Sequence, residues 1–379
     1  MPTMPTMPTM RIIFTVTNDL SYDQRMHRIC RSLASGGHRV LLVGRVLPHS
    51  IPLENRTFGQ KRLGCFFRKG FLFYAEYNFR LFFFLLFARF DAVCSIDLDS
   101  LPAGCMASLL RRKKRVFDAH EYFTQVPEVV DRPLVRIFWE MIARICLPFY
   151  KYAYTVGPAL AEIFSKRYGL VFEVVRNVPS TVATGKDAAP DEADALSAEV
   201  GVLYMGALNE GRGIETALEA MQYLDHVRLW LAGEGDLSDQ LRRLAAELGV
   251  ESKVTFFGYV KPDDLQNLAA RSWLGLNLLE NRGLSYYYSL ANKFFASVQA
   301  GVPVLTMNFP EHRALNAEYE VAVLLDELTP QVVANAILNL LNNKDLYKRL
   351  QQNCLAARQE WNWEKEEIVL FKIWDKVSM

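Results

Sequence analysis

Two stretches of the chain place a basic side chain beside glycines or polar aromatic residues, just before a predicted helix. The first, residues 205–213, follows a predicted strand and reads Met-Gly-Ala-Leu-Asn-Glu-Gly-Arg-Gly. Glycines at such a corner let the backbone approach a phosphate, and the Arg212 guanidinium adds a fixed charge with paired donors. We expect Gly206, Arg212 and Gly213 to bind an anion; an ordinary strand–turn–helix corner is the alternative.

The second stretch is a polar, tyrosine-rich loop at residues 285–289 that leads into a predicted helix at 290–299. Asn292 and Lys293 fall in the first turn of that helix. A lysine in the first turn opposes the helix dipole, so it does not stabilise the helix. Its position makes sense if an anion binds at the helix end; a solvated loop with ordinary capping is the alternative.

Predicted strands and helices alternate on both sides of one break in the pattern. Before the break, the predicted strands are 11–17, 39–43, 91–96, 115–118, 153–156 and 172–175, and the predicted helices are 22–34, 102–110, 134–145 and 159–168. After it, the predicted strands are 200–204, 227–232, 254–257, 274–279, 302–307 and 321–325, and the predicted helices are 214–222, 237–248, 262–270, 290–299, 330–342 and 344–360. This alternation predicts parallel sheets covered by helices on both faces.

The expected organisation is two α/β domains with a ligand cleft facing the carboxyl ends of their strands. Residues 1–9 repeat Met-Pro-Thr three times and are expected to be a disordered extension. Residues 10–180 form the first domain and residues 200–360 the second. Residues 181–199, rich in Ala, Asp, Ser and Thr, form the linker. An aromatic amphipathic segment, 361–379, closes the chain.

Charge and cysteine content narrow the class of protein. The first 180 residues hold 25 Lys and Arg against 14 Asp and Glu, whereas the remainder holds 18 against 28. The six cysteines are scattered without a Cys-x-x-Cys pair, which argues against a zinc ribbon or a disulfide scaffold. They favour a reducing compartment, so we expect a cytoplasmic protein. Asp97-Leu98-Asp99 has the outline of a metal-binding triplet, but single triplets recur by chance and we expect no metal.

Two segments of the basic first part suggest a membrane surface. Residues 70–90 are rich in Phe and Leu but contain charged residues, which favours a buried or interfacial helix over a membrane span. The basic run 111–115 is expected either to form a solvated loop or to contact lipid phosphates, and no nucleic-acid module accompanies it. Docking at an anionic inner leaflet predicts salt-sensitive vesicle binding that weakens when 111–115 are neutralised.

An ordered set of motifs in the second part resembles the C-terminal domain of glycosyltransferase family 4. The set comprises the Gly-x-Leu-x-x-x-Arg-Gly corner, Leu-Ala-Gly-Glu-Gly at 231–235, 254–260, the Asn-Lys-x-Phe helix and Ala-Gly-x-Pro-Val at 300–304. Residues 10–44 resemble the N-terminal domain of that family. The resemblance implies the GT-B fold, with two Rossmann-like domains facing a cleft and a C-terminal helix that crosses back to the first domain. It also implies retaining sugar transfer from a nucleotide diphosphate-sugar to a glycan or lipid-linked hydroxyl acceptor, without cofactor or metal.

The resemblance implies roles for particular residues. Arg212 falls at the pyrophosphate-binding position, Asn292 and Lys293 near the donor phosphates, and Tyr259 and Val260 near the nucleobase. His120, in Asp-Ala-His-Glu after a predicted strand, takes the position of a histidine that faces the donor sugar; a carboxylate neighbour would fix its tautomer. A buried, hydrogen-bonded histidine is the alternative. Asn18, Asp19 and Arg25 are expected on the acceptor side.

The chain also departs from the family pattern. The two carboxylates of the Glu-x7-Glu signature are replaced by Tyr288 and Ala296, and Ala207 replaces an arginine of the glycine corner. Glu280 is a candidate to supply a carboxylate from another point. These losses leave two alternatives open: a non-catalytic GT-B binding module and a GT-B nucleotide-sugar epimerase. A nicotinamide-dependent oxidoreductase lacks support, since no strand leads into Gly-x-Gly-x-x-Gly.

Overall fold

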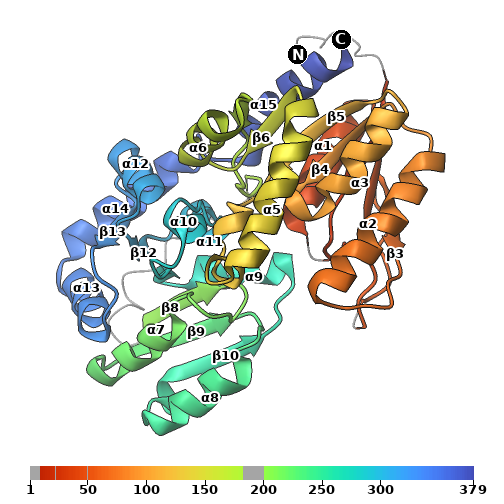
Figure 1. Ribbon diagram of the computed structural model, residues 1–379. Coiled ribbons are helices and arrows are strands. Elements are labelled where there is room, and N and C mark those ends of the chain that lie inside the picture. Colours follow the sequence, from red (N-terminus) through yellow and green to blue (C-terminus); the bar gives the residue numbers. More distant parts are fainter. Residues whose placement is uncertain (1–8, 22, 49, 182–199) are drawn as a thin grey trace. The chain divides into compact units, whose positions relative to one another are not determined.

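The computed structural model describes the chain except residues 1–8, 22, 49 and 182–199 (Figure 1). The predicted N-terminal extension and linker therefore lie almost entirely outside the described residues. The chain divides into two compact units. The first comprises the residues up to Arg176 together with Glu366–Met379, and the second comprises Asn177–Lys365. The final residues of the chain thus belong to the first unit.

The first unit is built on a parallel sheet with the strand order β3-β2-β1-β4-β5-β6-β7. Its strands are β1 (Arg11–Thr15), β2 (Arg39–Arg45), β3 (Gly59–Leu63), β4 (Ala92–Ile96), β5 (Lys114–Ala119), β6 (Tyr152–Thr155) and β7 (Phe172–Val174). β1 pairs with both β2 and β4, so that Phe14 lies between Leu42 and Cys94. The middle residues of these central strands are mainly apolar because both sheet faces are covered.

Helices cover this sheet: α1 (Gln24–Ser35), α2 (Gly70–Phe87), α3 (Asp97–Leu110), α4 (Pro127–Val130), α5 (Pro133–Cys146), α6 (Pro158–Tyr168) and α15 (Trp363–Ser378). The last of these fastens the C-terminus to the first unit. The ring of Trp374 packs 5.5 Å from that of Phe14, and Arg176 pairs with Glu366 at 2.6 Å. Lys114 donates to the carbonyl oxygens of the last turn of α15.

The second unit has a parallel sheet of the order β10-β9-β8-β11-β12-β13. Its strands are β8 (Val200–Met205), β9 (Val227–Ala232), β10 (Val254–Gly258), β11 (Leu274–Asn277), β12 (Val304–Met307) and β13 (Ala322–Leu325). Its helices are α7 (Ile214–Ala220), α8 (Ser238–Glu247), α9 (Pro262–Arg271), α10 (Leu284–Tyr287), α11 (Asn292–Gln299), α12 (Pro310–Glu318), α13 (Pro330–Asn342) and α14 (Lys344–Ala357). Both units thus confirm the predicted alternation of parallel strands and helices.

The structure adds four elements that the sequence pattern did not predict: β3, α4, α10 and α12. β3 reads Gly-Gln-Lys-Arg-Leu and pairs only with β2. Its sequence can stay polar because it is an edge strand of the sheet. α10 converts part of the predicted polar loop before α11 into one helical turn.

Candidate active site

Open parallel sheets bind ligands beyond the carboxyl ends of their strands, at the point where the strand order reverses. In the second unit this point lies between β8 and β11. The glycine corner follows β8, and the tyrosine-rich stretch follows β11. The backbone N–H of Glu280 donates to the carbonyl oxygen of Gly211 at 3.0 Å, which joins the two stretches. The two stretches that the sequence singled out as anion sites therefore meet beyond the carboxyl ends of the strands of one sheet.

The glycine corner depends on close backbone contacts. Gly213 has a φ of +67°, and a Cβ there would lie 2.1 Å from the carbonyl oxygen of Leu278. A Cβ on Gly233, whose φ is +152°, would lie 1.9 Å from the carbonyl oxygen of Gly206. Glycine at these positions lets the loops after β8, β9 and β11 touch. The packing alone accounts for Gly213, and phosphate contacts by Gly206 and Gly213 stay a prediction.

Two cations lie at this edge, each against a tyrosine ring. The guanidinium of Arg212 lies 4.7 Å from the ring centre of Tyr286, and Nζ of Lys293 lies 4.1 Å from that of Tyr204. Burial, and then the charge of Arg212, lower the pKa of Lys293 well below its ordinary value. Two neighbouring cations of which one is desolvated form a site that gains free energy when an anion enters.

Several buried polar atoms around these cations have no hydrogen-bond partner among the residues that the structure describes. They are Nε of Arg212, Oε2 of Glu215, Oγ of Ser289, Oδ1 of Asn292 and Nζ of Lys293. Buried polar groups in folded proteins are nearly always hydrogen-bonded, and each exception calls for an explanation. A polar anionic ligand explains the donors Arg212, Ser289 and Lys293, while hydroxyl groups on it would satisfy Glu215 and Asn292.

The helix that follows the glycine corner contributes less than the sequence suggests. α7 has seven residues, shorter than the predicted helix over 214–222, and a 3-10 turn replaces its last part. α11 begins at Asn292 and has no side-chain cap. In the first turn of α11 the backbone N–H of Phe294 donates to the carbonyl oxygen of Ala291 at 3.1 Å, so the cations Arg212 and Lys293 carry most of the positive charge at the site.

Glu280 also belongs to this edge. Burial, followed by repulsion from Glu215, raises the pKa of the Glu280 carboxyl. The two residues at the positions of the missing carboxylates, Tyr288 and Ala296, both make apolar contacts. Tyr288 stacks edge-on with the ring of Tyr287 at 5.0 Å, and Ala296 packs against an apolar cluster around Leu203. Glu280 and Glu215 therefore lie close enough for their charges to interact, in the two chain segments that also carry Arg212 and Tyr286.

Tyr259 and Val260, the predicted nucleobase contacts, follow β10 at the edge of the sheet. The side chain of Tyr259 is 56% exposed, whereas Val260 packs against the apolar cluster that includes Met205 and Ala232. Their role in base binding stays a prediction.

In the first unit the strand order reverses between β1 and β4, and His120 follows the neighbouring strand β5. Asp118 is fully buried and accepts hydrogen bonds from Arg25 at 3.1 Å and from His120 Nε2 at 2.9 Å. Burial opposes the charge on Asp118, but Arg25 and His120 outweigh it and lower its pKa. An ionised carboxylate only accepts, so Nε2 of His120 carries the hydrogen and Nδ1 is left to contact a ligand.

The same contacts raise the pKa of His120. Burial by itself would lower that pKa, but the charge of Asp118 and its hydrogen bond outweigh burial. The side chain of His120 is 19% exposed, so the ring is bonded to buried Asp118 on one side and is accessible to solvent on the other. The structure thus identifies Asp118 as the carboxylate that fixes the tautomer of His120.

The Asp97-Leu98-Asp99 triplet forms the first turn of α3. Asp97 adopts a φ of +51° and accepts a hydrogen bond from the backbone N–H of His120 at 2.8 Å. Asp99 accepts a hydrogen bond from Thr17. Burial raises the pKa of Asp97 well above its ordinary value and that of Asp99 to about 6. Both carboxyl groups are therefore tied into the sheet edge around His120.

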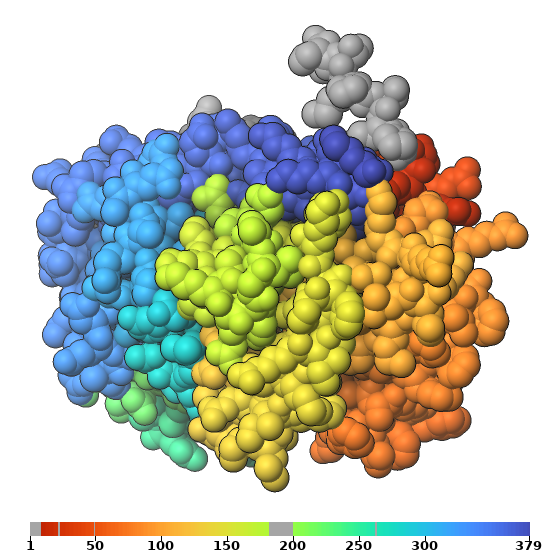
Figure 2. Space-filling model, turned by 45° about the horizontal axis from the view of Figure 1, so that its top comes forward, coloured from red at the N-terminus to blue at the C-terminus, as the bar shows by residue number. Residues whose placement is uncertain are grey.

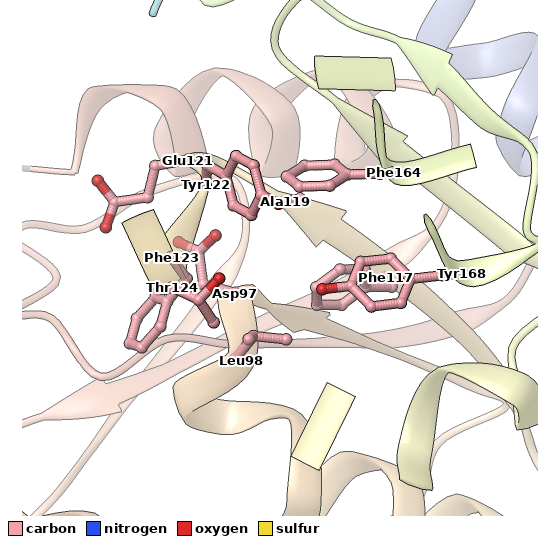
Figure 3. Close-up of a pocket in the computed structure, with 10 residues that line it drawn as sticks. All are labelled: Asp97, Leu98, Phe117, Ala119, Glu121, Tyr122, Phe123, Thr124, Phe164 and Tyr168. Atoms are coloured by element: carbon pink, nitrogen blue, oxygen red, sulfur yellow. The ribbon is translucent and has the colours of Figure 1, made fainter. Parts of the chain in front are cut away.

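A hollow of about 270 Å³, partly open to solvent, adjoins this network. Figure 3 shows the rings of Phe117, Tyr122, Phe164 and Tyr168 on one side and the carboxyl groups of Asp97 and Glu121 on the other. The enclosed space has room for about one water molecule, so the hollow does not hold a sugar ring in this conformation.

The predicted acceptor-side residues lie in different surroundings. Asn18 is exposed, whereas Asp19 is buried and pairs with Arg62 at 2.6 Å. Arg25 is buried and also donates to the carbonyl oxygen of Val175 at 2.9 Å. Arg25 can therefore act on a ligand only through Asp118 and His120. Sequence reasoning missed Arg62, Glu215 and Ser289, whose partners or lack of partners appear only in three dimensions.

Comparisons with known proteins show which family and which fold the chain resembles. Residues 196–355 match the family model described as glycosyl transferases group 1. The lipopolysaccharide core biosynthesis glycosyltransferase LpsE of Rhizobium meliloti strain 1021 is 28% identical over 246 residues, which are 59% of this chain and 69% of that protein.

Two solved structures share the fold over nearly the whole chain. Sucrose-phosphate synthase from Thermosynechococcus elongatus has a TM-score of 0.76 at 17% identity, over 97% of this chain and 98% of that one. HepE of Anabaena, in complex with UDP and glucose, has a TM-score of 0.74 at 14% identity, over 97% and 100%. Likeness at these identities establishes the fold, and the family match across the second unit establishes the class of enzyme. The second unit thus carries a domain that matches glycosyl transferases group 1, and the chain is a glycosyltransferase with the GT-B fold.

Proposed function

We propose that this enzyme moves a sugar from a nucleoside diphosphate-sugar to a hydroxyl acceptor with retention of configuration at the anomeric carbon. The observation that carries the proposal is the pair of cations Arg212 and Lys293, set among unpartnered buried polar atoms where the strand order of the second unit reverses. A diphosphate fits this site because it supplies two negative charges and several acceptor oxygens.

The chemistry requires one bond to break and one to form. The bond between the anomeric carbon and the diphosphate oxygen breaks, and the acceptor oxygen bonds to that carbon on the same face. The acceptor proton leaves with the departing phosphate or to solvent. Arg212, Lys293 and the first turn of α11 stabilise the negative charge that develops on the leaving diphosphate. No metal or cofactor takes part in the proposed reaction.

His120 is proposed to contact the donor sugar through Nδ1. With Nε2 bound to Asp118, a protonated His120 donates from Nδ1 to a sugar or phosphate oxygen. Glu280, with Glu215, is proposed to bind hydroxyl groups of the donor in place of the missing carboxylate pair.

The acceptor is proposed to be a glycan, carried on a lipid. The matched relative named for lipopolysaccharide core biosynthesis supports this class, and the neighbour solved with UDP and glucose supports a nucleotide-sugar donor. The protein is proposed to work on the cytoplasmic side of the membrane, since all six of its cysteines are free.

The experiment is a thermal-shift screen with UDP, GDP and ADP, followed by sugar transfer from the matching donor. Binding of one nucleoside diphosphate raises the melting temperature, and Arg212→Ala reduces that shift strongly. NMR of the product then shows whether the anomeric configuration is retained. Absence of any nucleotide effect, or an unchanged shift in Arg212→Ala, overturns the proposal.

One alternative has its own observation. Tyr288 and Ala296 replace the two carboxylates of the family signature, and this loss favours a binding protein without catalysis. Nucleotide binding that depends on Arg212, without donor turnover in the presence of a range of acceptors, would support this alternative. Conversion of the donor sugar without acceptor would indicate an epimerase.

A further inference from the structure

Helix α2 is apolar on two opposite sides. Phe73, Tyr77, Leu81 and Leu85, four residues apart, are buried against the sheet of the first unit. A second stripe with the same spacing, Phe71, Ala75, Phe79, Phe83 and Phe87, faces solvent. The exposed fraction of Phe87 is 80%. A surface helix of a globular protein normally has a polar outer face, so the outer stripe of phenylalanines calls for a partner.

The turn before α2 adds two more exposed rings. The backbone N–H groups of Phe66 and Phe67 both donate to Glu76 at 2.9–3.0 Å, and Arg80 pairs with Glu76 at 2.8 Å. The guanidinium of Arg80 also lies 5.1 Å from the ring centre of Phe66. Phe66 is 85% exposed although its backbone is fastened. An exposed ring on an ordered backbone is suited to insertion between lipids.

Two further helices continue this surface. α3 packs against both α2 and α5, and the rings of Phe71 and Phe138 lie 5.7 Å apart. In Figure 2 the surfaces of α2 and α3 (orange) and of α5 (yellow) adjoin on one face. α3 exposes Met106, Leu109 and Leu110, and α5 exposes Leu134, Val135, Ile137, Met141 and Ile145. The exposed apolar side chains of α2, α3, α5 and the 66–67 turn are named the apolar face below.

Basic residues stand at the ends of the helices that form the apolar face. Exposed Arg68 and Lys69 precede α2, and Arg89 follows it. Arg112 follows α3 and Arg132 precedes α5, both exposed. Basic side chains beside exposed apolar residues are typical of helices that lie in a membrane interface, where the charges reach anionic headgroups.

The basic run 111–115, in contrast, is largely used within the first unit. Arg111 donates to carbonyl oxygens of Leu85 and Ala88, and Arg115 donates to those of Lys113 and Phe149. Lys114 holds the last turn of α15. Neutralising this run would therefore disturb the fold, and it is not a clean test of lipid contact.

We propose that the apolar face docks on the surface of an anionic lipid bilayer. The charge of the surrounding residues favours anionic lipid over a neutral surface, and the breadth of the apolar face over three helices favours a plane over a groove-bound peptide. Among the helices that the structure describes, α2 alone meets the length and composition needed to cross a membrane. Its inner stripe is built into the core of the first unit, so docking leaves the fold intact whereas spanning would not.

The test is co-sedimentation of the full chain with vesicles of phosphatidylcholine and phosphatidylglycerol in equal parts, and with phosphatidylcholine alone. The variant Phe79→Ser/Phe83→Ser/Phe87→Ser removes three rings of the outer stripe. We expect its partition onto the anionic vesicles to fall by about tenfold or more, since each ring buries apolar area in the interface. Arg68→Gln/Lys69→Gln/Arg89→Gln should weaken binding to the anionic vesicles and reduce its dependence on salt.

A matched control changes three exposed apolar residues elsewhere: Val171→Ser/Leu355→Ser/Ile368→Ser. This control should bind vesicles like the wild type. Melting temperatures of all variants show that each is folded. The proposal is overturned if the wild type does not bind anionic vesicles at low salt, or if the triple Phe variant binds equally well. It is also overturned if the outer stripe instead holds a dimer in solution, or if alkaline carbonate fails to extract the protein.

The outcome is independent of the donor chemistry. Soluble-acceptor transfer and nucleotide binding should be the same in the triple Phe variant and in the wild type, because Phe79, Phe83 and Phe87 are exposed on the outer side of α2, whereas Asn78, on another side of that helix, bonds to the backbone of Asp99. Loss of vesicle binding with intact nucleotide binding separates this inference from the proposed function.

Discussion

Lys293→Met should change stability and nucleotide affinity in opposite directions. In the structure Nζ of Lys293 is buried, faces the ring of Tyr204 at 4.1 Å and has no hydrogen-bond partner among the described residues. Methionine keeps the length of the side chain and removes the polar group. If the unpartnered amine of Lys293 destabilises the free protein, Lys293→Met should raise the stability of the free protein. The same variant should weaken the nucleotide complex, because it removes a contact with the ligand.

The magnitudes follow from these contacts. An unsatisfied buried polar group costs about 1–3 kcal/mol, and the lost cation–π contact offsets about 1 kcal/mol of the gain. The free energy of unfolding should therefore rise by about 1 kcal/mol. A charge-assisted hydrogen bond to a diphosphate contributes about 1.5–3 kcal/mol, so nucleotide affinity should fall by about tenfold to a hundredfold.

Urea unfolding and isothermal calorimetry with the cognate nucleoside diphosphate measure the two effects. Lys253→Met is the matched control, because Nζ of Lys253 donates to the carbonyl oxygens of Met221 and Leu224 at 3.2 and 2.7 Å. That variant should lose stability and keep its affinity. If Lys293→Met destabilises the free protein and leaves nucleotide affinity unchanged, the lysine is a packing residue and the argument for an anion site fails.

Three further predictions follow from the ionisable groups. Since the pKa of Lys293 is lowered in the free protein and a diphosphate restores it, binding should take up a proton and weaken as pH rises. Calorimetry in Tris and in Hepes, two buffers of different ionisation enthalpy, should show this for the wild type and not for Lys293→Met. Asp99 binds its proton more tightly when folded, with a pKa of about 6, so its contribution to stability should fall by about 2 kcal/mol between pH 4 and pH 7. Asp99→Asn should remove this part of the pH dependence of urea unfolding, and equal slopes would contradict the assignment. Asp118→Asn leaves Arg25 buried without its charge partner and should cost about 3 kcal/mol of unfolding free energy, while Asp91→Asn, whose partner Arg11 is exposed, should have a much smaller effect.

Local signals in the sequence predicted the parts of the site that depend on chain geometry. Gly213 and the corner around it are readable because a left-handed residue beside a strand leaves few alternatives to glycine. Lys293 stands out because it opposes the dipole of its own helix. The order of strands and helices similarly follows from the spacing of apolar residues, which is why both parallel sheets could be predicted.

Other parts depend on contacts between distant residues and left no local signal. Arg25 lies on a helix far in sequence from the Asp118–His120 pair at the end of a strand, and only the fold joins Arg25 to that pair. The basic run 111–115 looked like a free surface because its partners are backbone carbonyl oxygens, which no sequence pattern marks. The outer stripe of α2 shows the converse: its composition predicted an apolar helix, and only the structure shows which side stays uncovered.

The central claim is that the second unit binds the diphosphate of a nucleotide-sugar through Arg212 and Lys293. Calorimetric titration of UDP, GDP and ADP into the wild type and into Arg212→Ala/Lys293→Met tests it directly. The account predicts that at least one of these nucleotides binds the wild type and that the double variant binds it about a hundredfold more weakly or worse, while the matching nucleoside without phosphate shows no difference between the two proteins. Equal nucleotide affinity in both proteins, or no binding of any of the three to the wild type, would contradict it.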